Sequence, residues 1–217
     1  MSKKTIWDLL KAKGFSDVAA AAIIGNMEAE SNCIPYRIQG DFSAGYQKSK
    51  DYTANVDHGV ISKDDFIYHG PGGGGYGLMQ WTYFSRKAGL YDLTVPKSIS
   101  IGDEAQQVNW LVEELNQGEF QSVMGTLVLS NSIRECSDSL IKKYLRPADQ
   151  SEAACVQRAK LGQDFYNEFA IGQAEDPDGQ PGMIQVSEEE YNMLKRAELV
   201  VMYMKDILQM LEEFNYE

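Results

Sequence analysis

The chain has 217 residues, a formal net charge of −12 and 43% hydrophobic residues. This length accommodates one domain of ordinary size plus an appendage, and the apolar content is sufficient for a core. The acidic balance excludes ordinary nucleic-acid binding, which needs clustered Lys and Arg against phosphates, and it disfavours attraction to anionic membranes. No apolar run approaches the length of a membrane span.

The three cysteines, Cys33, Cys136 and Cys155, are scattered along the chain. They form no CxxC or Cys/His pattern, so we expect three reduced thiols and no zinc or other metal site. The first 15 residues are basic but lack the continuous apolar core of a signal peptide. We therefore expect synthesis in the cytoplasm and, for any action outside it, a separate export route.

Two helices are predicted near the N-terminus, over residues 5–13 and 17–30. Ser16 is a good N-cap for the second helix, which has an alanine-rich start. Gly25 lies inside this second pattern, where a glycine usually allows close approach of another backbone. The helix is expected to end near Glu30.

Residues 36–75 are rich in Gly, Ser, Asp and Tyr, with short alternating pieces. This composition predicts irregular structure with a small hairpin, and the segment "YTANVDHG" (52–59) has the pattern of a tight hairpin that aims Asp57. The stretch "HGPGGGGYG" (69–77) is a glycine-rich loop. It is not a phosphate loop, because no GK[ST] follows the glycines.

From Gln80 onward the pattern is helical again. Arg146 and Pro147 are expected to break the helical pattern, and Ser151 to begin the last helix of this part. The predicted helical segments span residues 81–93, 102–117, 120–130, 132–145 and 151–170.

The last 47 residues hold 11 acidic and 3 basic side chains, so much of the negative charge lies there. Residues 171–186 contain Pro, Gly and acidic residues and predict a linker. Residues 187–217 predict an amphipathic helix with an apolar heptad stripe that begins with a capping box. This helix either docks on its own domain or mediates self-association.

Two carboxylates in "GNMEAESN" (25–32), Glu28 and Glu30, are candidates for a catalytic acid. On a regular helix they point about 200° apart, so they cannot both face one cleft. Glu30 follows the apolar face, where desolvation raises a carboxyl pKa toward the range of a general acid. The alternative is that Glu30 is a solvated residue at a helix end.

A second candidate segment is "GYGLMQWT" (75–82). Gly77 permits close approach of backbone to a cleft, and Gln80 beside Trp81 pairs a hydrogen-bonding amide with a flat ring, a common combination for sugar recognition. The alternative is that Trp81 and its apolar neighbours are core and that Gln80 is incidental.

Together the two segments, separated by a polar excursion of some 45 residues, resemble the lysozyme-like superfamily, and most closely the phage tail lysozyme family. Further support comes from "DYTANVDHG", "YGLMQWTYFSRKAGL", "SIGDEAQQVNWLVEEL" and "KKYLRPADQSEAACVQRAKLGQDFYNEFA". The resemblance covers residues 5–170 and leaves 171–217 uncovered.

The resemblance implies an α+β, mostly α-helical fold: a lysozyme-like domain (1–170) with a small irregular or β lobe beside a cleft, followed by the linker and the C-terminal helix. It implies an enzyme that cleaves bacterial peptidoglycan between N-acetylmuramic acid and N-acetylglucosamine, without metal or cofactor. Glu30 takes the place of the general acid. Substrate contacts are expected from Tyr76, Gly77, Gln80, Trp81 and His69.

The second catalytic group is left open by the resemblance. In goose-type lysozymes acids flank the segment equivalent to "GLMQ", whereas here the residue two past Gln80 is Thr82. Asp57 is the first choice among the acids of residues 36–75, and Thr82 could instead hydrogen-bond a water. Arg86 and Lys87 are natural contacts for carboxylates of the wall, or simply a solvated helix face.

Three functions therefore remain open: a muramidase, a lytic transglycosylase acting on the same bond, and a non-catalytic wall-binding or tail-structural protein. A binding module would not need the acid in "ES" (30–31), which argues against the third. Without a signal peptide, a phage enzyme would reach the wall through a phage-encoded pore or on a phage particle. No nucleic-acid or membrane partner is expected.

Overall fold

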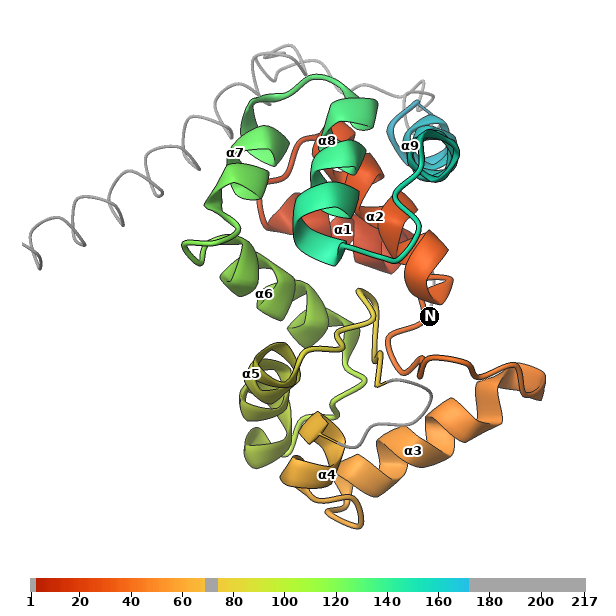
Figure 1. Ribbon diagram of the computed structural model, residues 1–217, viewed down its shortest axis with the longest axis vertical. Coiled ribbons are helices and arrows are strands. Elements are labelled where there is room, and N and C mark those ends of the chain that lie inside the picture. The colour runs from red at the N-terminus through yellow and green to blue at the C-terminus, as the bar shows by residue number, and fades with distance from the viewer. Residues whose placement is uncertain (1–2, 69–73, 172–217) are drawn as a thin grey trace, which may run out of the picture.

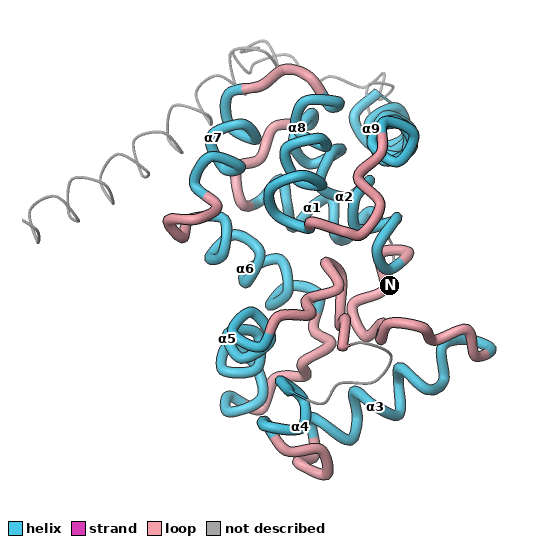
Figure 2. Tube along the Cα trace, viewed as in Figure 1, coloured by secondary structure: helices cyan, strands magenta, loops and turns pink. Residues whose placement is uncertain are grey.

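The computed structural model describes residues 3–68 and 74–171, and this part of the chain is mostly helical. Figure 2 shows helices joined by loops, with no strand in the described segments. The α-helices are α1 (Lys3–Ala12), α2 (Asp17–Ser31), α3 (Gln47–Asp57), α4 (Lys63–Tyr68), α5 (Phe84–Thr94), α6 (Glu104–Leu115), α7 (Gln121–Leu129), α8 (Ile133–Ser139) and α9 (Glu152–Tyr166). Short helical turns are η1 (Ala44–Tyr46), η3 (Val95–Lys97), η4 (Leu140–Leu145) and η5 (Asn167–Ile171).

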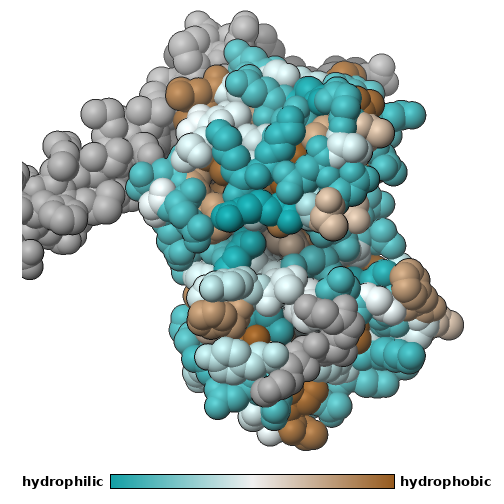
Figure 3. Space-filling view, viewed as in Figure 1, coloured by the Kyte–Doolittle hydropathy of each residue, from teal (hydrophilic) through white to brown (hydrophobic). Residues whose placement is uncertain are grey.

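The helices form two parts that meet at a waist (Figure 1). One part contains α1, α2, α7, α8 and α9, the other contains α3, α4 and α5, and α6 lies between them. The face seen in Figure 3 is largely hydrophilic, while the apolar side chains of α2 and α6 are buried. No described helix is long and apolar enough to cross a membrane.

Helix α2 confirms several sequence predictions. Ser16 caps it, with its hydroxyl accepting a hydrogen bond from the Ala19 amide at 3.1 Å. The helix ends at Ser31, one residue beyond Glu30, and Asn32 adopts the left-handed conformation at its C-cap. Later in the chain, Ser151 caps α9 as predicted.

Gly25 is the point where α2 crosses α9, as its position in the helix predicted. A Cβ added at Gly25 would lie 2.5 Å from the backbone N of Gly162 and 2.9 Å from the carbonyl O of Arg158. A Cβ at Gly162 would lie 2.8 Å from the carbonyl O of Ala21. Because both helices present glycine at the crossing, their backbones touch and the registers of α2 and α9 are fixed against each other.

Residues 36–75 differ from the prediction. The structure does not show a β lobe: the described residues of this segment contain η1, α3 and α4, and only single bridges pair Ile38 with Tyr76 and Tyr76 with Trp81. The hairpin predicted over residues 52–59 is wrong, because residues 47–57 are helix α3. The buried positions Ser49, Thr53 and Val56 recur every three to four residues, which is a helical period. The alternation of polar and apolar residues that favours a strand extends over only about six residues at a time.

Asp41 initiates α3 from outside the helix. Its carboxylate accepts hydrogen bonds from the backbone amides of Ser43 (2.8 Å) and Ser49 (2.9 Å) and from both hydroxyls. Burial alone would raise the pKa of Asp41, but these hydrogen bonds outweigh it and hold the pKa well below its ordinary value. Asp41 is thus an ionised anchor for this part of the chain.

The predicted linker and C-terminal helix lie outside the described residues, apart from Ile171 at the end of η5. All three cysteines are described and buried, and none of them forms a disulfide, in agreement with the predicted reduced thiols.

Candidate active site

A pocket of about 790 Å³ lies where the two parts of the molecule meet. Its lining comes from the end of α2, the chain that follows it, the turn before α5 with the first turn of that helix, the chain before α7, and the segments around η4. The lining residues are Glu30, Arg37, Gln39, Gly40, Met79, Gln80, Thr82, Tyr83, Ser85, Arg86, Glu119, Phe120, Tyr144, Leu145, Arg146, Pro147 and Ala148.

Glu30 reaches this pocket from the last turn of α2, and its side chain is 16% exposed. Its Oε1 accepts a hydrogen bond from Nη1 of Arg158 on α9 at 2.6 Å. The same Nη1 contacts Oδ1 of Asn26 at 3.3 Å, and Asn26 in turn donates to the hydroxyl of Ser137 on α8 at 3.0 Å. The carboxylate is therefore held by a buried polar chain that joins three helices.

The glycine crossing explains this ion pair. Arg158 lies one helical turn before Gly162, and Glu30 lies just over one turn after Gly25. With the two backbones in contact at the glycines, the arginine arrives beside the glutamate. Glu28, by contrast, pairs with Lys3 at 2.7 Å and does not line the pocket.

Ser31, the second residue of "ES", links the helix end to the turn opposite. Its hydroxyl donates to the carbonyl O of Leu78 at 3.0 Å. On the other side of the turn, the buried amide of Gln107 on α6 accepts from the Leu78 N–H at 2.8 Å and donates to the carbonyls of Pro35 and Ile101. The turn is thereby fixed against both α2 and α6.

Two of the predicted substrate contacts do not line the pocket because they shape the turn itself. Gly77 has φ +76°, and a Cβ there would lie 2.6 Å from the Gln107 amide. Tyr76 is 1% exposed, and its hydroxyl is hydrogen-bonded to Thr53 at 2.8 Å. Gln80 does line the pocket, with its amide donating to the carbonyls of Arg37 and Gly77.

Trp81 is fully buried and offers no exposed ring to a sugar. Its Nε1 donates to Oε2 of Glu114 at 2.6 Å, beneath the pocket floor. Glu114 also accepts hydrogen bonds from Tyr144 and, at 2.7 and 2.9 Å, from Arg86. Burial would lower the pKa of Arg86, but Tyr144 and Glu114 outweigh it and hold that pKa above its ordinary value. This cluster makes a rigid, charge-paired floor.

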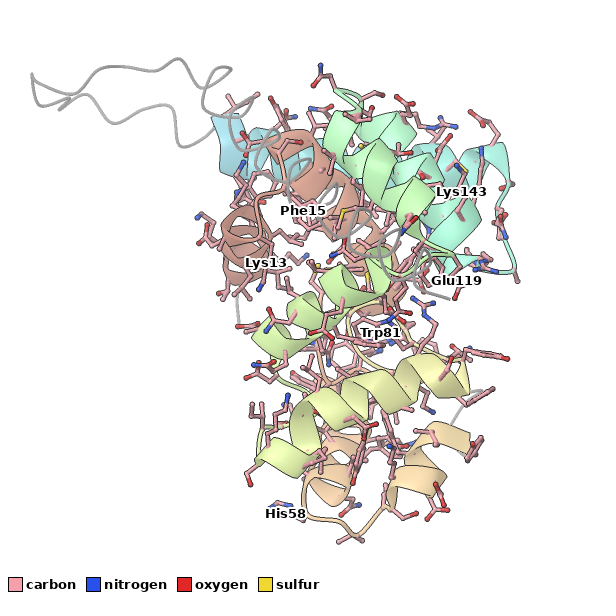
Figure 4. All side chains as sticks on the ribbon, turned by 90° about the vertical axis from the view of Figure 1, so that its left-hand side faces the viewer. Lys13, Phe15, His58, Trp81, Glu119 and Lys143 are labelled. Carbon is pink, nitrogen blue, oxygen red and sulfur yellow. The ribbon has the colours of Figure 1, made fainter. Side chains whose placement is uncertain are left out.

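Thr82 lines the pocket, and its hydroxyl donates to the carbonyl of Gln80 at 3.0 Å. Asp57 does not: it ends α3 and accepts hydrogen bonds from the Ile101 amide (2.8 Å) and the Ser100 hydroxyl. Figure 4 shows its neighbour His58 at the far end of the α3–α5 part, whereas Trp81 and Glu119 lie near the waist. His69 lies outside the described residues.

The Arg86 and Lys87 pair is not a solvated helix face. Arg86 is bound to Glu114, and Lys87 is 1% exposed with its Nζ 4.8 Å from the centre of the Phe66 ring. Burial lowers the pKa of Lys87 to about 8. Neither side chain is placed as an open contact for wall carboxylates.

Several site residues were not found from the sequence. Tyr83 follows the "GLMQWT" motif directly, and its aromatic neighbour Phe84 was a signal that could have been used. Glu119 pairs with Arg146 at 3.3 Å across the pocket lining. Arg158 had no sequence signal, since it is separated from Glu30 by more than 120 residues.

The described residues contain no group of three or more His, Cys, Asp or Glu side chains placed to hold a metal ion. The chain belongs to the phage tail lysozyme family, whose model matches residues 2–169. No similar sequence was found among curated proteins. Membership implies a phage-related role in lysis of the bacterial wall, with peptidoglycan as the substrate.

Proposed function

We propose that this protein is a muramidase that hydrolyses the β-1,4 bond between N-acetylmuramic acid and N-acetylglucosamine, with Glu30 as the general acid. The observation that supports this most is the position of the Glu30 carboxylate, which lines the pocket while Arg158 holds one of its oxygens at 2.6 Å. A general acid needs a fixed direction toward the proton acceptor. The buried chain through Asn26 and Ser137 provides it.

In this proposal Oε2 of Glu30 carries the proton, because Oε1 is occupied by Arg158. Transfer of that proton to the glycosidic oxygen breaks the bond and leaves positive charge on the sugar ring. The carboxylate that remains is negative, and Arg158 stabilises it. The leaving chain departs as an alcohol, and the ring is then attacked by water.

Glu119 is the candidate base for the water, since Glu30 and Glu119 are the two carboxylates among the described lining residues. An inverting hydrolase needs a second carboxylate about 6.5–9.5 Å from the first. Thr82 takes the water-holding role, because its hydroxyl donates to Gln80 and keeps its own oxygen available as an acceptor.

Exposed aromatic rings beside the pocket support a carbohydrate ligand. Tyr83 lines the pocket and is 62% exposed, and its ring centre is 4.6 Å from that of Phe84. Phe84 stacks on Tyr68 at 5.7 Å. Binding pockets combine aromatic surfaces with a few placed polar groups. In this proposal Tyr83 and Phe84 take the stacking role that the sequence had assigned to Trp81.

The test is Glu30→Gln in a turbidity assay on purified bacterial walls. We expect loss of clearing by at least 100-fold, a typical contribution of a general acid, with an unchanged melting temperature. Glu28→Gln is the matched control, since Glu28 lies on the same helix, pairs with Lys3 and does not line the pocket. Clearing by folded Glu30→Gln at the parent rate would refute the assignment.

A second candidate, a lytic transglycosylase, is favoured by one observation: Glu119 is paired with Arg146 and its side chain is 63% exposed, which is a poor environment for a base. A transglycosylase needs no second carboxylate, because the 6-hydroxyl of the muramic acid attacks instead. Mass spectrometry of digested wall separates the two. Reducing-end products support the hydrolase, and anhydro-muropeptides support the transglycosylase.

A further inference from the structure

Among the described residues, the arginines that line the pocket are paired with carboxylates, with one exception. Arg86 pairs with Glu114, and Arg146 pairs with Glu119. Arg37 also lines the pocket, but within residues 3–68 and 74–171 no carboxylate lies within ion-pair distance of it. The exception is notable because the chain as a whole carries an excess of acidic residues.

Arg37 is fixed in place by contacts that, among the described residues, include no anionic partner. Its guanidinium carbon lies 4.2 Å from the centre of the Tyr46 ring. Its backbone carbonyl accepts from the Gly77 amide at 2.8 Å and from the Gln80 side chain at 3.1 Å. One guanidinium nitrogen, Nη1, is buried and has no hydrogen-bond partner among the described residues.

A partly desolvated cation without a counter-charge is unfavourable, and an anion bound beside it removes that cost. A planar guanidinium matches a carboxylate in particular, through parallel hydrogen bonds. The ring of Tyr46 limits the directions in which the Arg37 fork can point. Arg37 is therefore preorganised for an anionic ligand.

We propose that Arg37 is the site that binds a carboxylate borne by the muramic acid residues of the peptidoglycan strand, and so distinguishes N-acetylmuramic acid from N-acetylglucosamine, which bears none. This inference rests on the proposed function, because it places the muramic acid ring in the same pocket as Glu30. Arg37 takes the role of wall-carboxylate contact, for which Arg86 and Lys87 are the candidates in the sequence. In the structure Arg86 is paired with Glu114, and Lys87 is buried in the core.

The carboxylate has two possible sources in the wall: the lactyl group of muramic acid residues without a stem peptide, and the stem peptide where one is amide-linked to the lactyl group. The experiment measures binding to the Glu30→Gln protein, so that strands are not cut, by isothermal titration calorimetry. Three probes are used: peptide-free glycan oligomers with free lactyl carboxylates, the same oligomers with these carboxylates converted to methylamides, and oligomers that retain stem peptides.

We expect Arg37→Gln to weaken binding of the peptide-free, free-carboxylate oligomer by about 10- to 100-fold, the size of a charge-assisted contact. Binding of the methylamide oligomer should not change. Arg37→Lys keeps the charge but not the fork and should recover part of the loss. Arg134→Gln is the control, since Arg134 pairs with Asp138 and Glu152 on the surface and does not line the pocket.

A loss seen only with peptide-bearing oligomers assigns the carboxylate to the stem peptide, which supports the site. Equal weakening of the free and methylamide oligomers, or no weakening of any of the three probes, overturns it and indicates that Arg37 only supports Tyr46. Failure of the proposed function has a different signature. In that case the Glu30→Gln protein with Arg37 intact binds none of the three probes, and it still clears walls.

Discussion

The two sides of the pocket are built in different ways. On one side, which we call the acid wall, α2 brings Glu30 to the pocket and α9 packs behind it: the two backbones touch at Gly25 and Gly162 and align Glu30 with Arg158. On the other side, the loop wall (residues 37–40 and 79–85), position is set by polar side chains such as Ser31 and Gln107. Backbone contact leaves almost no freedom, whereas hydrogen-bonded loops can change residue by residue.

This difference matches the two tasks of a glycan-cleaving enzyme. The acid must be held in one direction, and a small misplacement costs much of the rate. Substrate contacts tolerate more variation, and the loop wall is where Arg37, Gln80 and Tyr83 lie. We therefore expect changes in the acid wall to affect folding and the chemical step, and changes in the loop wall to affect binding and specificity.

The largest expected effect comes from Gly25→Ala. The new methyl carbon would lie 2.5 Å from the Gly162 backbone N and 2.7 Å from its Cα, so the two helices must separate. We expect a loss of about 3 kcal/mol or more in the free energy of unfolding, since the obstacle is backbone on both sides. Urea unfolding followed by circular dichroism measures it.

Gly125→Ala in α7 is the matched control, because an added Cβ there meets nothing within 4 Å. That variant should gain about 0.5–1 kcal/mol, as glycine is a poor helix former. If Gly25→Ala is no less stable than Gly125→Ala, the backbone contact that defines the acid wall is not present.

The two walls also differ in how much of their structure the sequence predicts. In the acid wall it predicted the Ser16 cap, the end of α2 near Glu30 and the close approach at Gly25, because each depends on local chemistry. It could not predict Arg158, whose position follows from the packing of α9 on α2. In the loop wall it identified Gln80 and Thr82 as candidates, and both line the pocket.

The errors of the sequence analysis also have physical causes. The sequence pattern favours a hairpin where helix α3 forms, because no local cap signal marks the start of the helix. The carboxylate that initiates it, Asp41, lies six residues before the helix. An indole next to a glutamine suits sugar binding, so the sequence offers Trp81 as a substrate contact with a core position as the alternative, and the structure shows the core position. Its partner Glu114 is 33 residues away, and only the fold shows that the ring is buried.

The second prediction tests the acid wall without disturbing the glycine contact. Arg158→Met removes the cation at Glu30 but keeps most of the buried side-chain volume. We expect kcat on walls to fall by about 10- to 100-fold, because the acid loses its fixed direction. KM should stay nearly constant, since Arg158 does not line the pocket. Steady-state kinetics on soluble glycan oligomers separates the two.

Arg158→Lys should restore part of kcat, and Arg134→Met, on the surface of α8, should change neither parameter. A rise in KM with unchanged kcat would place Arg158 in substrate binding. The acid wall would then not be confined to folding and the chemical step.

The smallest expected effect is a change in stability on replacing Lys87, in the part of the molecule that supports the loop wall. Lys87 lies on α5, is 1% exposed, and has its ammonium over the Phe66 ring. Burial lowers its pKa from 10.5 to about 8 in the folded protein. Between these values the unfolded chain binds more protons than the folded one, so this group makes stability rise as the pH increases from about 8 to 10.5. Below pH 8 the buried ammonium is a constant cost.

Lys87→Met should therefore raise the free energy of unfolding at pH 7 by about 1–2 kcal/mol. The gain over the parent should shrink toward pH 10, where the parent lysine is neutral when folded. Urea unfolding at several pH values measures this difference, with Lys97→Met as the exposed-lysine control. A constant gap between parent and Lys87→Met across this range would mean that Lys87 keeps its proton. The Phe66 ring would then stabilise the buried ammonium of Lys87. The charge that supports the loop wall would in that case be compensated, as the charges in the acid wall are.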